Sequence, residues 1–245
     1  MNYKNIIIYG GSSEISFELV KKFINHCEKL VIFCRNKNNL LESYNLNEVD
    51  KGKIVIHETN IQDLNKNLDI IKNLQNISGV FWISGYTGDG EKEYNDIFQA
   101  KENIEINFTN PSLIINEISK KIIKNSNSFI SVFTSVAGLR GRKKQLFYSS
   151  SRSGLITYLS GLRQRLFKDK ILVMTVIPGY MNTKPFRNSN IKAPNFLITQ
   201  PNKVTKILLQ GIKKRKEIVY INFYWKIIMT IVKIIPEKIF KKLSF

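Results

Sequence analysis

Two stretches decide the fold of this chain: Phe133-Thr134-Ser135-Val136-Ala137-Gly138 and Tyr148-Ser149-Ser150-Ser151-Arg152-Ser153-Gly154. The first follows an apolar run and predicts the end of a buried strand with a polar tip. The second predicts the start of a long helix, and residues four apart lie on one helical face. Tyr148 and Arg152 are therefore expected to point together into the cleft that Ser135 lines. A strand-end hydroxyl beside a phenol and a cation can move a proton to or from an alcohol.

The composition favours a single α/β domain. The 245 residues are 43% hydrophobic and 11% aromatic, enough to bury a full core. A formal net charge of +19 favours an anionic partner, although the Lys-Asn-Ile bias of an AT-rich genome also raises it. Cys27 and Cys34 lack the spacing of a disulfide framework, so we expect free thiols and a cytoplasmic location. We expect no metal site, and nucleic-acid binding is disfavoured because the basic residues do not alternate with exposed aromatic residues.

Seven apolar runs, separated by helical patterns, predict the strands of one sheet. They are Asn5–Tyr9, Leu30–Cys34, Lys53–His57, Gly79–Ile83, Ser128–Thr134, Ile171–Ile177 and Ile218–Ile221. Strands that alternate with helices predict an α/β fold, namely a Rossmann-like doubly wound parallel sheet with helices on both faces. We assign residues 1–221 to this NAD(P)-binding domain, including a substrate lid at 184–200, and residues 222–245 to a C-terminal amphipathic helical extension.

The first strand and the next helix are joined by Gly10-Gly11-Ser12-Ser13, which predicts a phosphate-binding turn. Glycine lets backbone amides approach a pyrophosphate, and the helix N-terminus adds partial positive charge. Arg35 directly follows the second strand, where an acidic residue selects NAD(H) and an arginine accommodates the 2′-phosphate of NADP(H). We therefore expect NADP(H), with Ser12 beside its phosphate, and keep NAD(H) as the alternative.

These segments resemble the motifs of the short-chain dehydrogenase/reductase family. The matches come in the family's order: Gly10 and Ile15, Gly85, Asn107, Ser135 and Tyr148, and then Pro178-Gly179 with Thr183. The departures are Glu14 and Ser16 at two glycine positions, Ser84, and Arg152 in place of lysine. Ser16 is small enough for close helix packing, whereas the Glu14 carboxylate must point away from the phosphates.

The resemblance implies a role for each matching residue. Tyr148 would be the general acid in carbonyl reduction, Ser135 would orient the substrate oxygen, and Asn107 would hold a water of the proton relay. Arg152 would take over the tasks of the family lysine, which holds the nicotinamide ribose and stabilises the tyrosinate. The cofactor-binding residues would be Gly10, Ser12, Ser13, Ile15, Arg35, Asn60, Gly85, Tyr148, Arg152, Pro178, Gly179 and Thr183.

Two helices bear on the assembly of the protein. The helices that carry Asn107 and Tyr148 resemble those that pair subunits in this family, which implies a homodimer or homotetramer. The alternative for Asn107 is a structural residue that faces solvent in the middle of its helix.

The loop Leu139–Gln145 concentrates positive charge beside the proposed reaction centre. Clustered cations repel one another unless an anion binds among them. We therefore take Arg140, Arg142 and Lys143 as candidates for binding an anionic substrate. The alternative is a solvated loop in a basic protein.

The segment from Phe223 to Ile235 predicts a helix with Lys226, Thr230 and Lys233 on one narrow stripe. Apolar residues fill the remaining arc of this helix. A transmembrane span is disfavoured, because the run is short and a lysine at a bilayer centre costs about 2.5–3.5 kcal/mol. An interfacial helix on an anionic leaflet fits better. The alternative is a tail packed on its own domain or on a dimer mate.

A narrower resemblance concerns Gly-Gly-x-Ser-Glu-Ile at 10–15, Ser-Val-Ala-Gly at 135–138 before the basic loop, and the lysine-rich apolar tail. These are similar to decaprenylphosphoryl-2-keto-pentose reductases, which reduce a keto sugar on a polyprenyl phosphate at the cytoplasmic membrane face. The resemblance implies an NAD(P)H-dependent reductase of a keto group on an anionic, phosphorylated and polyprenyl-linked sugar in cell-envelope or polysaccharide biosynthesis. It also implies a peripheral protein on the inner membrane face. The alternatives are reduction of a 3-oxoacyl or similar lipid carbonyl, and a cofactor-binding scaffold that has lost catalysis.

Overall fold

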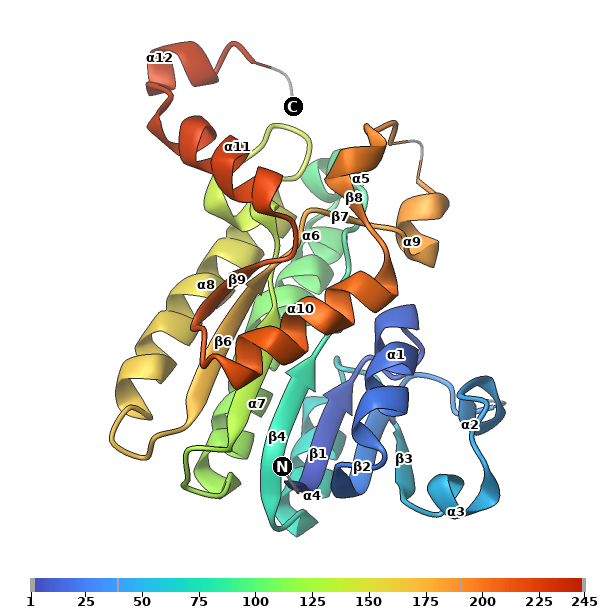
Figure 1. Cartoon of the computed structure of the whole chain (residues 1–245). Helices are drawn as coiled ribbons and strands as arrows, with labels where there is room; N and C mark the ends of the chain where they lie inside the picture. The colour runs from blue at the N-terminus through green and yellow to red at the C-terminus, as the bar shows by residue number, and fades with distance from the viewer. Residues whose placement is uncertain (1–2, 39, 190, 244–245) are drawn as a thin grey trace.

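Seven parallel strands form the central sheet, in the order β3-β2-β1-β4-β5-β6-β9 (Figure 1). The computed structural model describes residues 3–38, 40–189 and 191–243. The strands are β1 (Tyr3–Tyr9), β2 (Cys27–Cys34), β3 (Ile54–Glu58), β4 (Ile77–Trp82), β5 (Phe129–Phe133), β6 (Leu172–Ile177) and β9 (Ile218–Tyr220). The strand order reverses between β1 and β4, so a crevice forms there beyond the carboxyl ends of the strands. This confirms the doubly wound sheet expected from the sequence.

Helices cover both faces of the sheet (Figure 1). On one face lie α1 (Glu14–Phe23) and α10 (Pro201–Lys213), and on the other α4 (Leu64–Asn73), α7 (Asn110–Lys121) and α8 (Leu146–Arg165). The other helical elements are α2 (Leu40–Ser43), α3 (Glu48–Lys51), α5 (Gly90–Asn95), α6 (Ile97–Ile104), η1 (Glu105–Thr109), η2 (Val136–Leu139), α9 (Lys184–Arg187), η3 (Asn195–Leu197), α11 (Phe223–Ile234) and α12 (Glu237–Phe240).

The sheet separates two apolar cores. Successive residues of β1 alternate between them, with Ile6 and Ile8 in one core and Ile7 and Tyr9 in the other. A parallel strand covered on both faces needs apolar residues at nearly every position. This is why continuous apolar runs, rather than alternating ones, mark the strands in the sequence.

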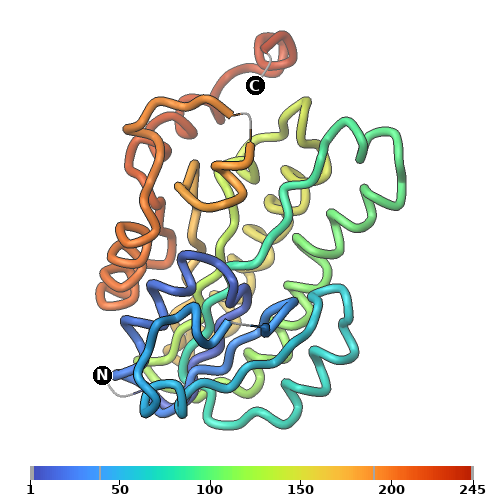
Figure 2. Tube along the Cα trace, turned by 90° about the vertical axis from the view of Figure 1, so that its right-hand side faces the viewer, coloured from blue at the N-terminus to red at the C-terminus, as the bar shows by residue number. Residues whose placement is uncertain are grey.

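The lid and the tail lie at the same end of the molecule, beyond the carboxyl ends of the strands (Figure 1 and Figure 2). The lid contains α9 and η3, and the short strands β7 (Tyr180–Met181) and β8 (Ile198–Thr199) pair at its base. The tail forms α11 and α12, and the tail residues 244–245 lie outside the described residues. No helix within the described ranges is long and apolar enough to cross a bilayer.

Candidate active site

The turn after β1, which the sequence predicts to bind phosphate, requires glycine at its first residue. Gly10 has a φ of +99°, and a Cβ there would lie 2.9 Å from the Ser84 hydroxyl oxygen, so only glycine fits. The Ser16 hydroxyl donates to the Gly10 carbonyl at 2.7 Å, and the Ser13 hydroxyl accepts from the Ile15 N–H to cap α1. The turn therefore forms although two of the family's glycines are absent, because Ser16 is small and fully buried.

The Glu14 carboxylate turns toward the lid. It accepts from the Lys184 backbone N–H at 2.8 Å and pairs with the Arg187 guanidinium at 2.5 Å. Partial burial raises the pKa of Glu14, but the bonds from Arg187 and Lys184 outweigh it and hold the pKa below its usual value. The sequence required this carboxylate to avoid the phosphates, and the structure places its partner on α9.

The expected adenosine end lies at the tips of β2 and β3. Arg35 follows β2 and is exposed, and the described residues provide it with no acidic partner. Ser12 is also exposed, on the turn before α1. Asn60 follows β3, where its backbone carbonyl accepts from the Asn67 side chain at 2.8 Å. An exposed guanidinium at the end of β2 is able to bind a phosphate, and the assignment of Arg35 to the 2′-phosphate stays a prediction.

Ser135 is fixed by the ends of two neighbouring strands. The Thr134 hydroxyl donates to the Val176 carbonyl at 2.8 Å, and the Val136 N–H donates to the Pro178 carbonyl at 3.0 Å. The Ser135 hydroxyl accepts from the Ala137 N–H at 3.1 Å, which starts the 3₁₀ turn η2. These bonds place Ser135 directly beside Pro178, the start of the expected nicotinamide segment.

Tyr148 and Arg152 lie together on α8, as their spacing predicted. The Arg152 guanidinium carbon is 5.3 Å from the centroid of the Tyr148 ring. Arg152 is 4% exposed, and its Nη1 donates to the Phe133 carbonyl at 3.3 Å. A Cβ on Gly138 would lie 2.8 Å from the Arg152 carbonyl carbon. Glycine at 138 therefore allows η2, and with it Ser135, to pack against the helix that carries Tyr148.

The guanidinium of Arg152 ends beside Gly85, at the end of β4. A Cβ on Gly85 would lie 1.7 Å from Arg152 Nη2 and 3.4 Å from Asn107 Oδ1. Asn107 is fully buried in the π-helical turn η1, which excludes the alternative that it faces solvent. Its Oδ1 accepts from the Tyr86 N–H at 2.9 Å and its Nδ2 donates to the Tyr86 carbonyl at 2.6 Å. A π-turn in a long helix often marks a functional site.

Among the residues that the structure describes, no carboxylate pairs with the buried charge of Arg152. Its Nε is buried and has no hydrogen-bond partner among the described residues. A buried, unpartnered donor on a cation is costly, so the site is suited to a group that brings acceptor oxygens. The ribose hydroxyls of a nicotinamide cofactor are such a group. Together with the Gly10 turn and Arg35, this donor set fits NADP(H).

The basic loop divides into residues with different roles. Arg140 donates to the carbonyls of Lys233 and Ile235, pairs with Glu237 at 2.6 Å and stacks on Phe240. This corrects the assignment of Arg140 to an anionic substrate, because tail groups that lie 93 to 97 positions away already use its donors.

Arg142 and Lys143 have no such partners. Arg142 is half-buried, and its side chain makes no hydrogen bond or ion pair within the described part of the chain; Lys143 is exposed. Burial lowers the pKa of Arg142, against the opposing influence of the nearby phenols of Tyr180 and Tyr148. The sequence did not single out Tyr180 of β7, because it lies between Gly179 and Thr183 at a position that the motif does not specify.

The expected nicotinamide segment is covered by the tail. A Cβ on Gly179 would lie 2.0 Å from the Trp225 indole nitrogen. Only glycine at 179 therefore leaves room for the Trp225 side chain of the tail. Thr183 precedes α9, and its hydroxyl lies 3.5 Å from the Met181 carbonyl. The sequence predicted Gly179 from its match to the family, but nothing in its spacing pointed to Trp225.

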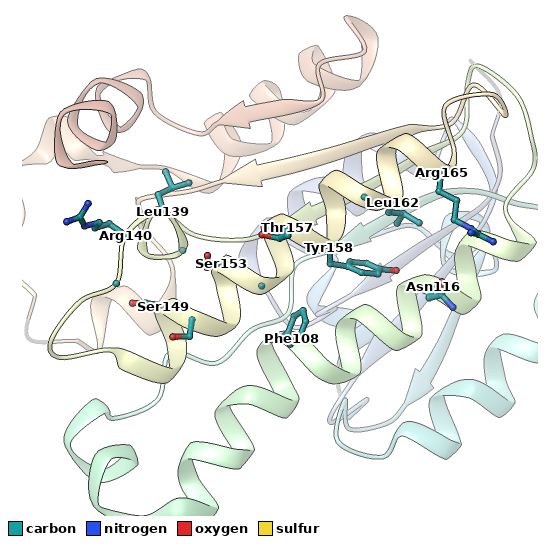
Figure 3. A pocket seen from close by; sticks show the side chains of 15 residues that line it. Phe108, Asn116, Leu139, Arg140, Ser149, Ser153, Thr157, Tyr158, Leu162 and Arg165 are labelled. Carbon is teal, nitrogen blue, oxygen red and sulfur yellow. The ribbon is translucent and has the colours of Figure 1, made fainter. Parts of the chain in front are cut away.

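A separate groove lies on the outer side of α8, between α8 and α7 (Figure 3). It has a volume of about 960 Å³, and Phe108 and Tyr158 lie between the two helices in it. Ser135, Tyr148 and Arg152 do not line it. The groove is therefore distinct from the reaction centre, although it borders the same helix.

Comparison with known proteins places this geometry in a family. The profile of the short chain dehydrogenases matches residues 4–193. An uncharacterized oxidoreductase of Mycobacterium tuberculosis is 21% identical over 97% of this chain and 96% of its own. A 3-oxoacyl-[acyl-carrier-protein] reductase of Bos taurus is 24% identical over 75% of this chain and 78% of its own.

Solved structures share the fold at low identity. A short chain dehydrogenase from Burkholderia cenocepacia, in complex with NADP, has a TM-score of 0.81 at 15% identity and covers 100% of this chain and 98% of its own. A short-chain dehydrogenase from Sphingobium yanoikuyae, in complex with NADPH, has a TM-score of 0.78 at 16% identity, over 96% of this chain and 97% of its own. The chain belongs to the short-chain dehydrogenase family and is an NAD(P)-dependent oxidoreductase that acts on carbonyl or hydroxyl groups.

Proposed function

We propose that this protein uses NADPH to reduce a keto group on an anionic, phosphorylated sugar in cell-envelope or polysaccharide biosynthesis. The observation that carries this proposal is Arg142, a half-buried guanidinium without an acidic partner in the described structure, close to the phenols of Tyr148 and Tyr180. NADPH is favoured over NADH by the exposed Arg35 at the end of β2, and NADP is bound by relatives of the same fold.

The residues of the site have distinct tasks in this reaction. NADPH, when bound, supplies the hydride to the carbonyl carbon. Tyr148 donates its phenolic proton to the carbonyl oxygen, while the Ser135 hydroxyl holds that oxygen in place. The positive charge of Arg152, 5.3 Å from the Tyr148 ring centroid, stabilises the tyrosinate that remains. Arg152 keeps its own proton, because a guanidinium does not deprotonate in proteins.

The charge of Arg142 supports a phosphorylated substrate over a neutral one. Burial lowers the pKa of Arg142 because the guanidinium has lost part of its hydration and has gained no carboxylate in exchange. A phosphate that accepts two parallel N–H bonds from the guanidinium offsets this loss of hydration free energy. The exposed Lys143 adds a second, weaker attraction for the same anion.

The test compares phosphorylated and neutral keto sugars. Arg142→Gln should raise KM for a keto-sugar phosphate about tenfold to a hundredfold, the loss of one or two bonds to a charged group. KM for a neutral ketone should stay unchanged. Lys144→Gln is the matched control, because it removes the same charge from an exposed position of the same loop. An unchanged KM for the phosphate in Arg142→Gln would refute the anionic substrate.

Two further parts of the proposal concern the surroundings of the enzyme. The tail favours a peripheral position at the cytoplasmic membrane face, where the enzyme would reach a polyprenyl-linked sugar.

The groove between α7 and α8 favours a homodimer or homotetramer, because small residues along α8 leave room for the same two helices of a second subunit. Sedimentation velocity of the purified protein tests the assembly directly, and a monomer at micromolar concentration would contradict it.

Reduction of a 3-oxoacyl or similar lipid carbonyl is the second candidate. It is favoured by the low-identity relatives with that activity in their names and by the exposed Phe196 and Ile191 in the lid. A higher kcat/KM for an acyl thioester than for any keto-sugar phosphate would select it.

A cofactor-binding scaffold without catalysis is the third candidate. It is motivated by Arg152, Glu14 and Ser84, which depart from the family's pattern. The test is NADPH oxidation by the wild type and by Tyr148→Phe. Turnover that disappears in Tyr148→Phe would exclude this candidate.

A further inference from the structure

The outward side of α11 is apolar although it faces solvent. Phe223, Ile227, Ile231 and Ile234 follow one another at spacings of three or four, which places them on one side of the helix. Their exposed fractions are 67%, 45%, 56% and 76%. Exposed apolar surface of this extent on one element marks an interaction site.

The lid extends this apolar side. Phe196 of η3 is 57% exposed and makes an edge-on contact with Tyr224 of α11, with 5.2 Å between ring centroids. The outer face, as we name it, consists of Phe196, Phe223, Tyr224, Ile227, Ile231 and Ile234. The helix α11, which carries most of this face, lies beyond the carboxyl ends of the strands (Figure 1).

The charges around the outer face identify what covers it. The tail carries five lysines and one glutamate, and the glutamate, Glu237, is already paired with Arg140. Two copies meeting through this face would bring their lysines together, which is repulsive. An anionic lipid surface instead attracts each lysine by about 1 kcal/mol, and a protruding apolar ridge can enter the headgroup region.

The inward side of α11 contacts three segments around the proposed active site, namely η2, β6 and the lid. Trp225 and Met229 pack on Val136, next to Ser135, and on Ile177. The Trp225 indole N–H donates to the Leu197 carbonyl at 3.1 Å, and the Asn222 side chain donates to the Phe196 carbonyl at 2.7 Å. Whatever moves or steadies α11 therefore acts on the lid and on the catalytic segment together.

We propose that the outer face docks on an anionic lipid bilayer, and that this contact restrains the lid because α11 is bonded to it. The active-site crevice, at the same end of the molecule, then opens toward the bilayer. This deepens the proposed function, on which it rests only for the lipid-linked substrate. The docking itself requires no substrate, so it can fail or succeed independently of the reductase activity.

The test is co-sedimentation of the full-length protein with vesicles, with no substrate present. Vesicles of phosphatidylglycerol and phosphatidylcholine in equal parts should bind the protein, and binding should weaken with salt and with phosphatidylcholine alone. Ile227→Ser and Ile231→Ser should each weaken binding about tenfold or more. Ile97→Ser is the matched control, because Ile97 is 78% exposed but lies on α6. Equal binding by all variants, or no binding by the wild type, would overturn the proposal.

Two readouts separate the rival explanations. If the serine variants abolish self-association in sedimentation velocity and vesicles have no effect, the outer face joins copies of the chain and the proposal fails. Hydrogen exchange reports the link to the lid: vesicles should slow exchange at 195–199 in the wild type. Trp225→Phe, which loses the bond to Leu197, should still bind vesicles but lose most of this protection. Vesicle binding without keto-sugar turnover would refute the proposed function and leave the docking intact.

Discussion

Replacing Gly85 with alanine should displace the Arg152 guanidinium from the active site. The new Cβ would lie 1.7 Å from Arg152 Nη2 and 3.0 Å from its Cζ. Arg152 is 4% exposed and its Nη1 is bound to the Phe133 carbonyl, so the guanidinium cannot simply turn into solvent. The side chain must leave its rotamer, lose this bond or push α8 away from η2.

The magnitude follows from these two losses. Overpacking a close-packed site costs about 1–3 kcal/mol, and a lost bond from a charged donor costs about 1.5–3 kcal/mol. In Arg152→Lys the side chain ends near the position of Cζ and has no Nη2, so the clash with the new Cβ is largely relieved. Gly85→Ala should therefore destabilise the wild type by about 1–3 kcal/mol more than it destabilises Arg152→Lys.

The assay is a double-mutant cycle. Thermal unfolding and NADPH binding by fluorescence are measured for the wild type, both single variants and the double variant. Gly141→Ala is the control glycine, because a Cβ there meets no described atom within 4 Å. If Gly85→Ala were as mild as Gly141→Ala, or if the cycle showed no coupling, the placement of Arg152 beside Gly85 would be wrong. Arg152→Lys alone should change kcat more than NADPH affinity, and equal changes would mean that Arg152 only holds the ribose.

Two carboxylates give the remaining predictions. Glu14→Gln removes an exposed ion pair with Arg187, worth about 0.2–1 kcal/mol. Because this pair ties the lid to the helix after the glycine turn, NADPH should dissociate up to about fivefold faster in stopped-flow experiments. Because the pKa of Glu14 is lowered, the effect should fade as pH falls through that pKa, and an effect that persists in acid would count against the ion pair. Burial raises the pKa of Glu93, which is 2% exposed, so its contribution to stability is present below the usual glutamate pKa and lost as pH rises through the folded value. Glu93→Gln, which can still accept from Asn103, should therefore raise Tm at pH 7, with a gain that disappears near pH 4; a constant difference across pH would contradict this.

The fold could be predicted from the sequence because the decisive forces are local. Each strand is covered on both faces, so each appears as a continuous apolar run such as Ile6-Ile7-Ile8. The placement of Tyr148 beside Arg152 could be predicted because the two residues lie four apart on one helix, and Ser135 lies one loop before them. Their mutual placement follows from helical geometry and from a strand end that must meet the same crevice.

The partners of charged residues could not be predicted in this way. Arg140 and Glu237 are 97 positions apart, and Glu14 and Arg187 are 173 apart. In a chain with 38 basic and 19 acidic residues, many pairings are compatible with the sequence, and packing alone selects among them. The loop cluster of Arg140, Arg142 and Lys143 therefore looks uniform in sequence, although one of its cations anchors the tail and another stands half-buried beside Tyr148.

Arg152 in place of lysine is a change of geometry as much as of chemistry. A lysine at 152 would end near the present Cζ and would need a water to reach the surroundings of Gly85 and Asn107. The longer arginine brings Nη2 to Gly85 itself, on the side that Asn107 Oδ1 also borders. Unlike an ammonium group, its guanidinium cannot release a proton. We therefore expect the proton that restores Tyr148 to arrive from the substrate side, where the charge of Arg142 is felt by the phenols of Tyr148 and Tyr180. We therefore expect the wild type to have a lower kcat than Arg152→Lys, with similar NADPH affinity in the two proteins.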